Sequence, residues 1–168
     1  MPMLPLTVVP IYASTLAVYS LTLTARVIKQ RVGLRVSLGD GTQQFLLDYI
    51  KATQEKPNDA ELLTKAADPM KSKYWPLLAA VRAHGNLFET APLVLLLATM
   101  CELNDTFSNR TLHALLAAFT VARVAHAELG VLRPLALGKG RTAGMMVTLT
   151  TTIVCAGGLA AQWAGWTE

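Results

Sequence analysis

Residues 77–101 read LLAAVRAHGNLFETAPLVLLLATMC, a run of Leu, Ala and Val that also carries charged and amide side chains. Ionisable groups are costly inside a membrane helix and usually mark a functional site. Arg82, Asn86 and Glu89 follow i, i+4, i+7 spacing, so a helix places all three on one face. The stretch therefore predicts a membrane-spanning helix with one polar face, whose polar groups need partners on other helices.

Three more segments are long enough to cross a bilayer, which takes about 20 apolar residues. Residues 1–25 and 142–167 carry no charged side chain, and residues 111–132 reach the same length with a few charges. Charged residues make up 15% of the chain, against about 25% in soluble domains. We therefore expect an all-α integral membrane protein, a bundle of four transmembrane helices in a lipid bilayer. The alternative is a soluble bundle with long buried helices.

The basic residues are unevenly placed along the chain. With four spans, every Lys and Arg except Arg110 falls in the first or third connection, or in the helix halves that face them. The positive-inside rule then places both connections in the cytoplasm or matrix. This pattern suits a bacterial inner membrane or an endoplasmic reticulum or mitochondrial membrane. A nucleic-acid partner is excluded despite the net charge of +4, because the basic residues border membrane segments and lack interleaved aromatic residues.

Residues 35–75 form a long insert between the first two spans. The sequence LGDG at residues 38–41 predicts a turn. A short helix is expected from residue 61, with Asn58 as its N-cap and Glu61 at capping-box distance. Another helix is indicated before this short one by residues that recur at helical spacing, namely Phe45, Leu46, Tyr49 and Ile50. We expect a cytoplasmic (or matrix) hairpin of amphipathic helices, which either lies on the lipid surface or binds a partner.

The predicted topology brings polar groups of three helices to one membrane level. The second helix begins at the basic face, the third ends there with Arg123 and His126, and the fourth begins there with Arg141 and Thr142. Guanidinium groups together with a carboxylate, an amide and a hydroxyl suit a small polyanion, or a thiolate held by a cation. A metal site is not expected, because Cys and His do not occur at ligand spacing.

Short motifs in this order resemble those of the MAPEG family, membrane-associated proteins in eicosanoid and glutathione metabolism. RAHGNLFET at residues 82–90 is similar to the family's second-helix signature. ARVAH at residues 122–126 resembles its third-helix motif, and GRT at residues 140–142 resembles the start of its fourth helix. LGDG at residues 38–41 is common before the second helix in bacterial members. The resemblance implies that residues 1–168 form a single MAPEG-like membrane domain.

The resemblance implies a homotrimer that binds glutathione between subunits near the cytoplasmic face. The motif positions implied to bind glutathione are Arg82, Asn86, Glu89 and Arg123. Glu89 would take the amino group of the tripeptide. Arg141 would act on the thiol, and Thr142 stands where prostaglandin E synthase-like members have a serine. Arg26 or Arg31 would add a further cation, although no motif fixes which.

The implied function is a membrane-bound glutathione-dependent transferase, peroxidase or isomerase acting on a lipophilic electrophile from the bilayer. Two features depart from the family: ELG at residues 128–130 replaces a third-helix tyrosine found in several catalytic members, and the insert at residues 35–75 is longer than usual. They favour a second hypothesis, a non-catalytic MAPEG-fold subunit of a larger membrane complex, for example a mitochondrial one, that docks through the insert. A transporter or channel fits less well, because the site lies on one side only.

The same residues also admit purely structural roles. An intramembrane ion pair, with Arg123 bound to Glu89 or to Glu128, would fix helix packing alone. His126 suits a packed or hydrogen-bonded position better than that of a base. Thr142 suits the N-cap of the fourth helix.

Overall fold

The computed structural model describes residues 6–165, and no strand occurs among them. The α-helices in this range are α1 (Val9–Leu34), α2 (Thr42–Glu55), α3 (Ala60–Ala66), α4 (Trp75–Leu103), α5 (Asn109–His126) and α6 (Lys139–Trp163). Shorter helical turns are η1 (Pro69–Lys71), the π-helical turn η2 (Ala127–Val131) and η3 (Pro134–Ala136).

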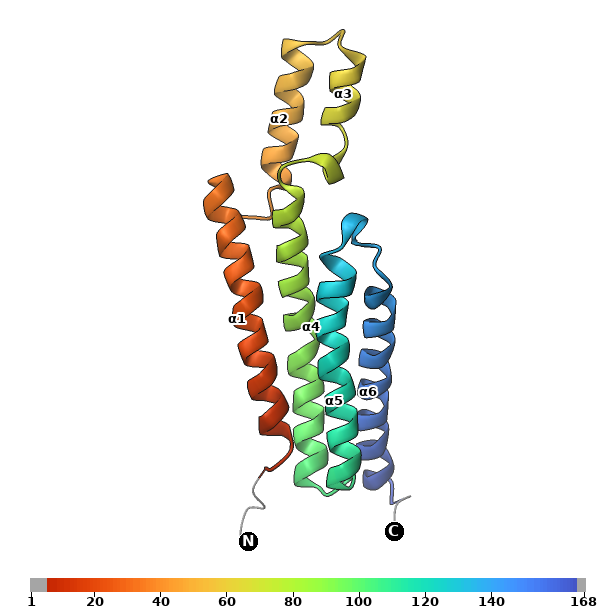
Figure 1. Cartoon of the computed structure of the whole chain (residues 1–168). Coiled ribbons are helices and arrows are strands. Elements are labelled where there is room, and N and C mark those ends of the chain that lie inside the picture. Colours follow the sequence, from red (N-terminus) through yellow and green to blue (C-terminus); the bar gives the residue numbers. More distant parts are fainter. Residues whose placement is uncertain (1–5, 166–168) are drawn as a thin grey trace.

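The helices α1, α4, α5 and α6 lie side by side as a bundle (Figure 1), and each is long and apolar enough to cross a membrane. The predicted all-α, four-span membrane fold is thereby confirmed. The first helix is shifted relative to the sequence prediction of about Leu4 to Ile28, because it begins at Val9 and continues to Leu34. Lys and Arg are good helix formers, and the helix ends only at Arg35, whose φ of 55° is left-handed. Residues 1–5 and 166–168 lie outside the described range.

The core of the bundle is apolar and is shared by all four long helices. Its largest fully buried side chains include Leu23 of α1, Val94 of α4 and Phe119 of α5, and Cys155 of α6 is also fully buried. At the end of the bundle where α4 meets α5, the Glu102 carboxylate accepts hydrogen bonds from the backbone N–H groups at the start of α1. That contact satisfies helix-terminal donors that would otherwise lack partners.

Glycine residues let α6 approach α5 and η2 closely. A Cβ atom on Gly144 would lie 2.6 Å from the carbonyl oxygen of Ala122 and 2.6 Å from the Cβ of His126. A Cβ atom on Gly140 would overlap with the carbonyl oxygen of Ala125. Small residues commonly bring membrane helices together in this way. The first turns of α6 are therefore held against the last turns of α5, where the predicted polar groups lie.

The helices α2 and α3 form a hairpin beyond the bundle, at the end where α1 ends and α4 begins (Figure 1). We call this the hairpin end. Asp59 caps α3 by accepting a 2.9 Å hydrogen bond from the backbone N–H of Leu62, so the predicted N-cap at Asn58 is wrong by one residue. A carboxylate is the better cap because it also interacts favourably with the helix dipole. The hydroxyl of the buried Tyr74 donates to Asp48 of α2 over 3.1 Å, which ties the hairpin to α4.

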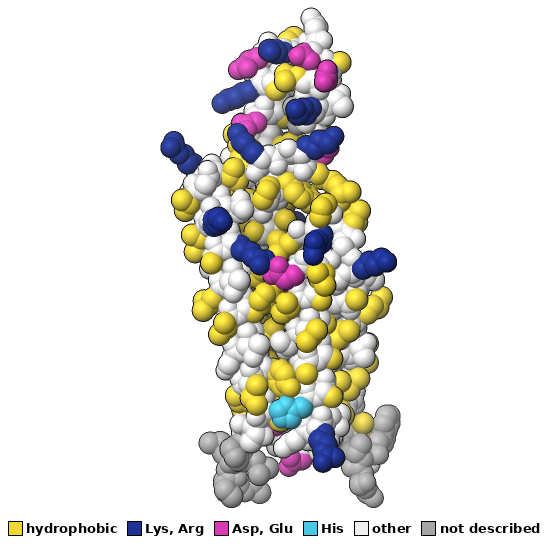
Figure 2. Space-filling model, viewed as in Figure 1, with side chains coloured by type: hydrophobic (Ala, Val, Ile, Leu, Met, Phe, Trp, Pro, Cys, Tyr) yellow, Lys and Arg dark blue, Asp and Glu magenta, His cyan; other side chains and the backbone are white. Residues whose placement is uncertain are grey.

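The basic side chains gather towards the hairpin end. Nearly all the Lys and Arg side chains visible in Figure 2 lie in the half of the molecule nearer the hairpin. Arg110 is in the first turn of α5 and therefore lies at the opposite end of the bundle. The uneven charge along the sequence thus becomes an uneven charge along the bundle axis.

The ion pair between Lys73 Nζ and Asp48 Oδ2 (2.9 Å) predicts a pH-dependent attachment of the hairpin. The hydrogen bond from Lys73 lowers the pKa of Asp48, and the same bond raises the pKa of Lys73. The stabilisation is therefore present above the ordinary carboxyl pKa of about 3.9 and is lost as pH falls through the lowered pKa of Asp48. It is lost again as pH rises through the raised pKa of Lys73.

Hydrogen exchange of the α2 amides, corrected for the intrinsic effect of pH, is the appropriate measurement. We expect faster exchange at acid pH in the parent protein, with a difference below about 1 kcal/mol because the pair is solvent-exposed. In Asp48→Asn the acid-dependent component should disappear. If Asp48→Asn kept the full acid dependence, this ion pair would not be what holds the hairpin.

Candidate functional site

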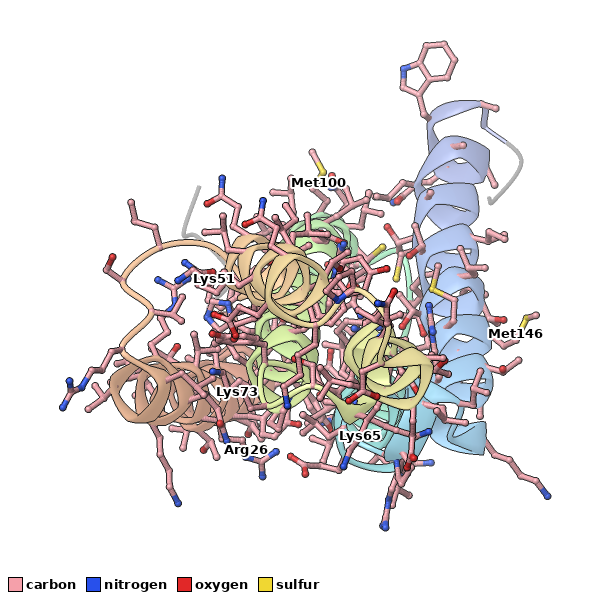
Figure 3. All side chains as sticks on the ribbon, turned by 90° about the horizontal axis from the view of Figure 1, so that it is seen from above. Arg26, Lys51, Lys65, Lys73, Met100 and Met146 are labelled. Atoms are coloured by element: carbon pink, nitrogen blue, oxygen red, sulfur yellow. The ribbon has the colours of Figure 1, made fainter. Side chains whose placement is uncertain are left out.

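A cavity of about 370 Å³ lies between α4, α5 and the first turns of α6. Of the residues predicted to form the site, the cavity is lined by Asn86, Glu89, Arg123, Arg141 and Thr142. Its other lining residues are Thr90, His126, Met145 and Met146. Met146 points from α6 away from the other helices (Figure 3), so it stands on the outer rim of the cavity.

Arg82 does not line this cavity. It is exposed, one helical turn nearer the hairpin end than Asn86. The pKa of the Asp40 carboxyl is lowered mainly by its hydrogen bonds from Thr42, and the positive charge of Arg82 adds to this effect. Arg82 therefore shares a helix face with the cavity residues but acts closer to the base of the hairpin.

Arg123 is the most unusual group in the cavity, because it is a cation with only 2% of its surface exposed. Its Nη2 atom donates to the backbone oxygen of Asn86 at 2.9 Å, and its Nη1 atom donates weakly to the hydroxyl of Thr148 at 3.4 Å. Its Nε atom has no hydrogen-bond partner. None of the ion pairs formed within residues 6–165 includes Arg123.

The predicted alternative, an ion pair of Arg123 with Glu89 or Glu128, is therefore wrong. Glu128 lies instead against α1, where its carboxylate accepts from Arg26 at 2.7 Å and from the hydroxyl of Tyr19 at 3.0 Å. A buried charge without a counter-ion costs free energy. The fold tolerates that cost at the wall of a cavity, which is where an anionic ligand would compensate it.

His126 connects the three helices that form the cavity. Its Nδ1 atom lies 2.9 Å from the backbone oxygen of Arg141, and its Nε2 atom lies 3.4 Å from the side-chain nitrogen of Asn86. We assign the proton to Nδ1, because a carbonyl can only accept and the amide nitrogen can only donate. His126 is thus a hydrogen-bonded packing residue, as the sequence indicated, and it sets the orientation of the Asn86 amide.

Arg141 and Thr142 lie in the exposed first turns of α6. The N-cap of α6 is Gly138, so the predicted N-cap role of Thr142 is wrong and its hydroxyl is not used for capping. The guanidinium of Arg141 makes one long hydrogen bond, 3.4 Å to the backbone oxygen of Ala136. Both side chains are therefore available to a ligand at the positive end of a helix dipole.

Glu89 is exposed at the edge of the cavity and takes part in no ion pair formed by the described residues. The hypothesis that Arg82, Asn86 and Glu89 serve only as an internal ion-pair network therefore finds no support in the contacts of residues 6–165. An exposed carboxylate on a membrane helix normally faces another protein surface or a polar cavity rather than lipid.

The further cations suggested near the site lie elsewhere in a single chain. Arg26 lies on α1, away from α6 (Figure 3), and is paired with Glu128. Arg31 donates to the backbone oxygens of Ser37 and Gly39, each at 2.9 Å, and so closes the turn after α1. Neither side chain lines the cavity between α4, α5 and α6.

Two hydroxyl residues of the site were missed in the sequence. Thr90 lines the cavity, and Thr148 contacts Arg123. Their spacing was an available signal, because Thr90 follows Asn86 by four residues and Thr148 follows Arg141 by seven. Helical periodicity therefore places each of them on the face of a residue that was already under consideration.

Together, these features define a four-span helical membrane protein with a polar, cation-lined cavity in one half of its bundle. The model of the MAPEG family matches residues 9–161, and the chain belongs to that family. Its members are membrane proteins associated in general with glutathione-related transferase and isomerase activity. Comparisons with curated proteins and with solved structures gave no match to the chain.

Proposed function

We propose that this protein is a membrane-bound glutathione-dependent transferase, peroxidase or isomerase that acts on a lipophilic electrophile from the bilayer. The observation that carries the proposal is the guanidinium of Arg123, which is buried at the wall of the cavity without a carboxylate partner among the described residues. The volume of about 370 Å³ lies in the lower range of small-molecule sites.

The charges around the cavity suit glutathione, which has two carboxylates, one ammonium group and a thiol. Arg123 and Arg141 supply cations for the anionic groups, and Glu89 supplies a carboxylate for the ammonium group. Arg82 adds a cation on the same helix face, towards the hairpin end. The cavity lining itself has two guanidinium groups and one carboxylate, a surplus of one positive charge. With Arg82, which lies one helical turn outside the cavity, the surplus is two, which equals the negative charge of glutathione in its thiolate form.

Bound glutathione would supply the nucleophile, because the thiolate and not the thiol attacks electrophiles. We assign to Arg141 the stabilisation of negative charge at sulfur, and to the Thr142 hydroxyl a hydrogen bond to the same atom. A cation acts more strongly in the low dielectric of a membrane protein than in water. The proton of the thiol leaves to water at the exposed first turn of α6.

The exposure of Glu89, Arg141 and Thr142 supports an oligomer in which a second copy covers the cavity. We propose the homotrimer that is implied by the resemblance to the family, with glutathione between neighbouring copies. Charged groups on a membrane helix are then enclosed by protein rather than by lipid. The mass of the protein in detergent, corrected for bound detergent, distinguishes the trimer from a monomer.

A second candidate function is that of a non-catalytic subunit of a larger membrane complex. The observation that favours this second function concerns Gly130. This residue lies in the segment at residues 128–130, which replaces the tyrosine of several catalytic members. A Cβ atom on Gly130 would lie 2.6 Å from the backbone nitrogen of Arg141, so no larger side chain fits there with α6 in this position. If the protein is an enzyme, Arg141 and Thr142 must therefore act without the help of a tyrosine hydroxyl. The hairpin of α2 and α3 would be the docking element.

Calorimetric titration with glutathione, together with turnover of an aryl halide and a lipid hydroperoxide, tests the proposal. Glu89→Gln should weaken binding by about 10- to 100-fold, because a charge-assisted hydrogen bond contributes about 1.5–3 kcal/mol. Arg141→Ala should mainly reduce turnover. Arg110→Ala, which removes a cation at the opposite end of the bundle, is the matched control and should behave like the parent. Binding without turnover would favour the non-catalytic subunit, and absence of both would reject the enzyme.

A further inference from the structure

A second cavity, of about 410 Å³, lies between α1, the start of α4 and the turn at residues 132–134. It shares no lining residue with the cavity between α4, α5 and α6. Three basic side chains line it, namely Arg26, Lys29 and Arg133. Its inner wall is apolar and includes the buried residues Ala79 and Ala80. Figure 2 shows basic side chains on both sides of a hollow with hydrophobic side chains in it.

The cavity has a surplus of positive charge. Arg26 is neutralised by Glu128, and this 2.7 Å ion pair fixes its side chain between α1 and η2. Lys29 and Arg133 are exposed, and neither occurs in the ion pairs formed by residues 6–165. Two uncompensated cations from different parts of the chain therefore face one hollow.

The position of the cavity along the bundle corresponds to a membrane interface. Lys29 lies in the last turns of α1, Trp75 is the first residue of α4, and Arg133 lies in the turn between η2 and η3. Trp, Lys and Arg concentrate at the headgroup level of a bilayer. Beyond this level, Ala79 and Ala80 continue the wall of the cavity along α4 towards the middle of the bundle.

We propose that this cavity binds the phosphate of an anionic phospholipid, with Lys29 and Arg133 as the cations that hold it. Basic hollows between transmembrane helices are a recurrent way to bind anionic headgroups. Trp75 would lie beside the glycerol region, and the apolar wall would receive the first part of the acyl chains. A free phosphate shares the headgroup chemistry but makes no use of that wall. The site is independent of the proposed glutathione function.

Native mass spectrometry of the full-length protein with phosphatidylglycerol or phosphatidylcholine is the direct test. We expect the parent to retain phosphatidylglycerol in preference to phosphatidylcholine. The double variant Lys29→Ala with Arg133→Ala should lose that preference by about 25-fold, since each Lys or Arg near a membrane surface contributes about 1 kcal/mol, or about fivefold. A second double variant, Lys29→Gln with Arg133→Gln, keeps longer polar side chains and should lose it equally.

The matched control is the double variant Lys51→Ala with Lys56→Ala, which removes the same charge from the hairpin and lies outside the cavity. It should retain phosphatidylglycerol as the parent does.

An equal loss of phosphatidylglycerol in this control would show attraction by net charge alone. Competition by inorganic phosphate as strong as that by phosphatidylglycerol would identify a free-anion site. Loss of glutathione binding with unchanged lipid retention in the Lys29/Arg133 variants would assign the cavity to glutathione. Each of these results would overturn the proposal.

Discussion

Replacing Arg123 by Met is expected to abolish glutathione binding while the bundle stays as stable as the parent or becomes more stable. The side chain is 2% exposed and forms no ion pair with a carboxylate among the described residues, so the native state carries much of the cost of a buried charge. Met fills a similar volume with a flexible apolar chain. We expect the free energy of unfolding to be unchanged or to rise on the order of 1 kcal/mol.

The hydrogen-bond partners of Arg123 give a reason why its replacement should not destabilise the fold. The backbone oxygen of Asn86 also accepts a 2.8 Å hydrogen bond from Thr90, and the Thr148 hydroxyl donates to the backbone oxygen of Gly144 at 2.8 Å. Neither group is therefore left without a hydrogen bond when the guanidinium is removed. Loss of the buried cation should weaken glutathione binding by about 100-fold or more, from two charge-assisted contacts.

Thermal unfolding in detergent and calorimetric titration of the same Arg123→Met sample are the required measurements. Arg110→Met is the matched control, because it makes the same chemical change at the far end of α5. A strongly destabilised variant that still binds glutathione would contradict the account, since it would show that Arg123 serves the fold rather than a ligand.

The second large effect is expected for Gly144→Val. Even a Cβ atom at this position would lie 2.6 Å from the carbonyl oxygen of Ala122 and from the Cβ of His126. We expect α5 and α6 to separate, at a cost of about 3 kcal/mol from overpacking. The 2.9 Å contact of His126 with the backbone of Arg141 would then be lost, and glutathione binding with it.

Gly157→Ala provides the control for this substitution. Gly157 lies on the same helix, and a Cβ atom there would meet nothing within 4 Å. It should leave stability unchanged or raise it by up to about 1 kcal/mol, because Ala favours a helix more than Gly. Thermal unfolding of both variants in one detergent compares them. Equal behaviour of Gly144→Val and Gly157→Ala would show that α5 and α6 are not packed as closely as the structure places them.

The fold followed from hydropathy because span length is a property of contiguous sequence. The lining of the cavity between α4, α5 and α6 followed from spacing and helix order, since Asn86, Arg123 and Arg141 each stand in the half of their helix that is nearer the hairpin end. The spacing of residues in the sequence determines which face of a helix they share, but it does not determine how far along that helix a cavity extends. The spacing therefore grouped Arg82 with Asn86 and Glu89, although Arg82 lies one helical turn nearer the hairpin end than Asn86 and does not line the cavity.

Contacts between distant segments were beyond the reach of sequence patterns. Whether Glu128 pairs with Arg123 or Arg26 depends on how α1 packs against η2, and the structure places it with Arg26. The start of α1 at Val9 depends in the same way on the carboxylate of Glu102, which is 93 positions away in the chain. Neither contact has a local signal.

The appearance of thiolate absorbance when glutathione is added to the purified protein is the most direct test of the central claim. The claim is that the cavity lined by Arg123 and Arg141 holds glutathione with its sulfur ionised. We expect a saturable thiolate signal near neutral pH in the parent and in Arg110→Ala, and its loss in Arg141→Ala. The absence of both thiolate signal and glutathione binding in the parent, or an undiminished signal in Arg141→Ala, would contradict that claim.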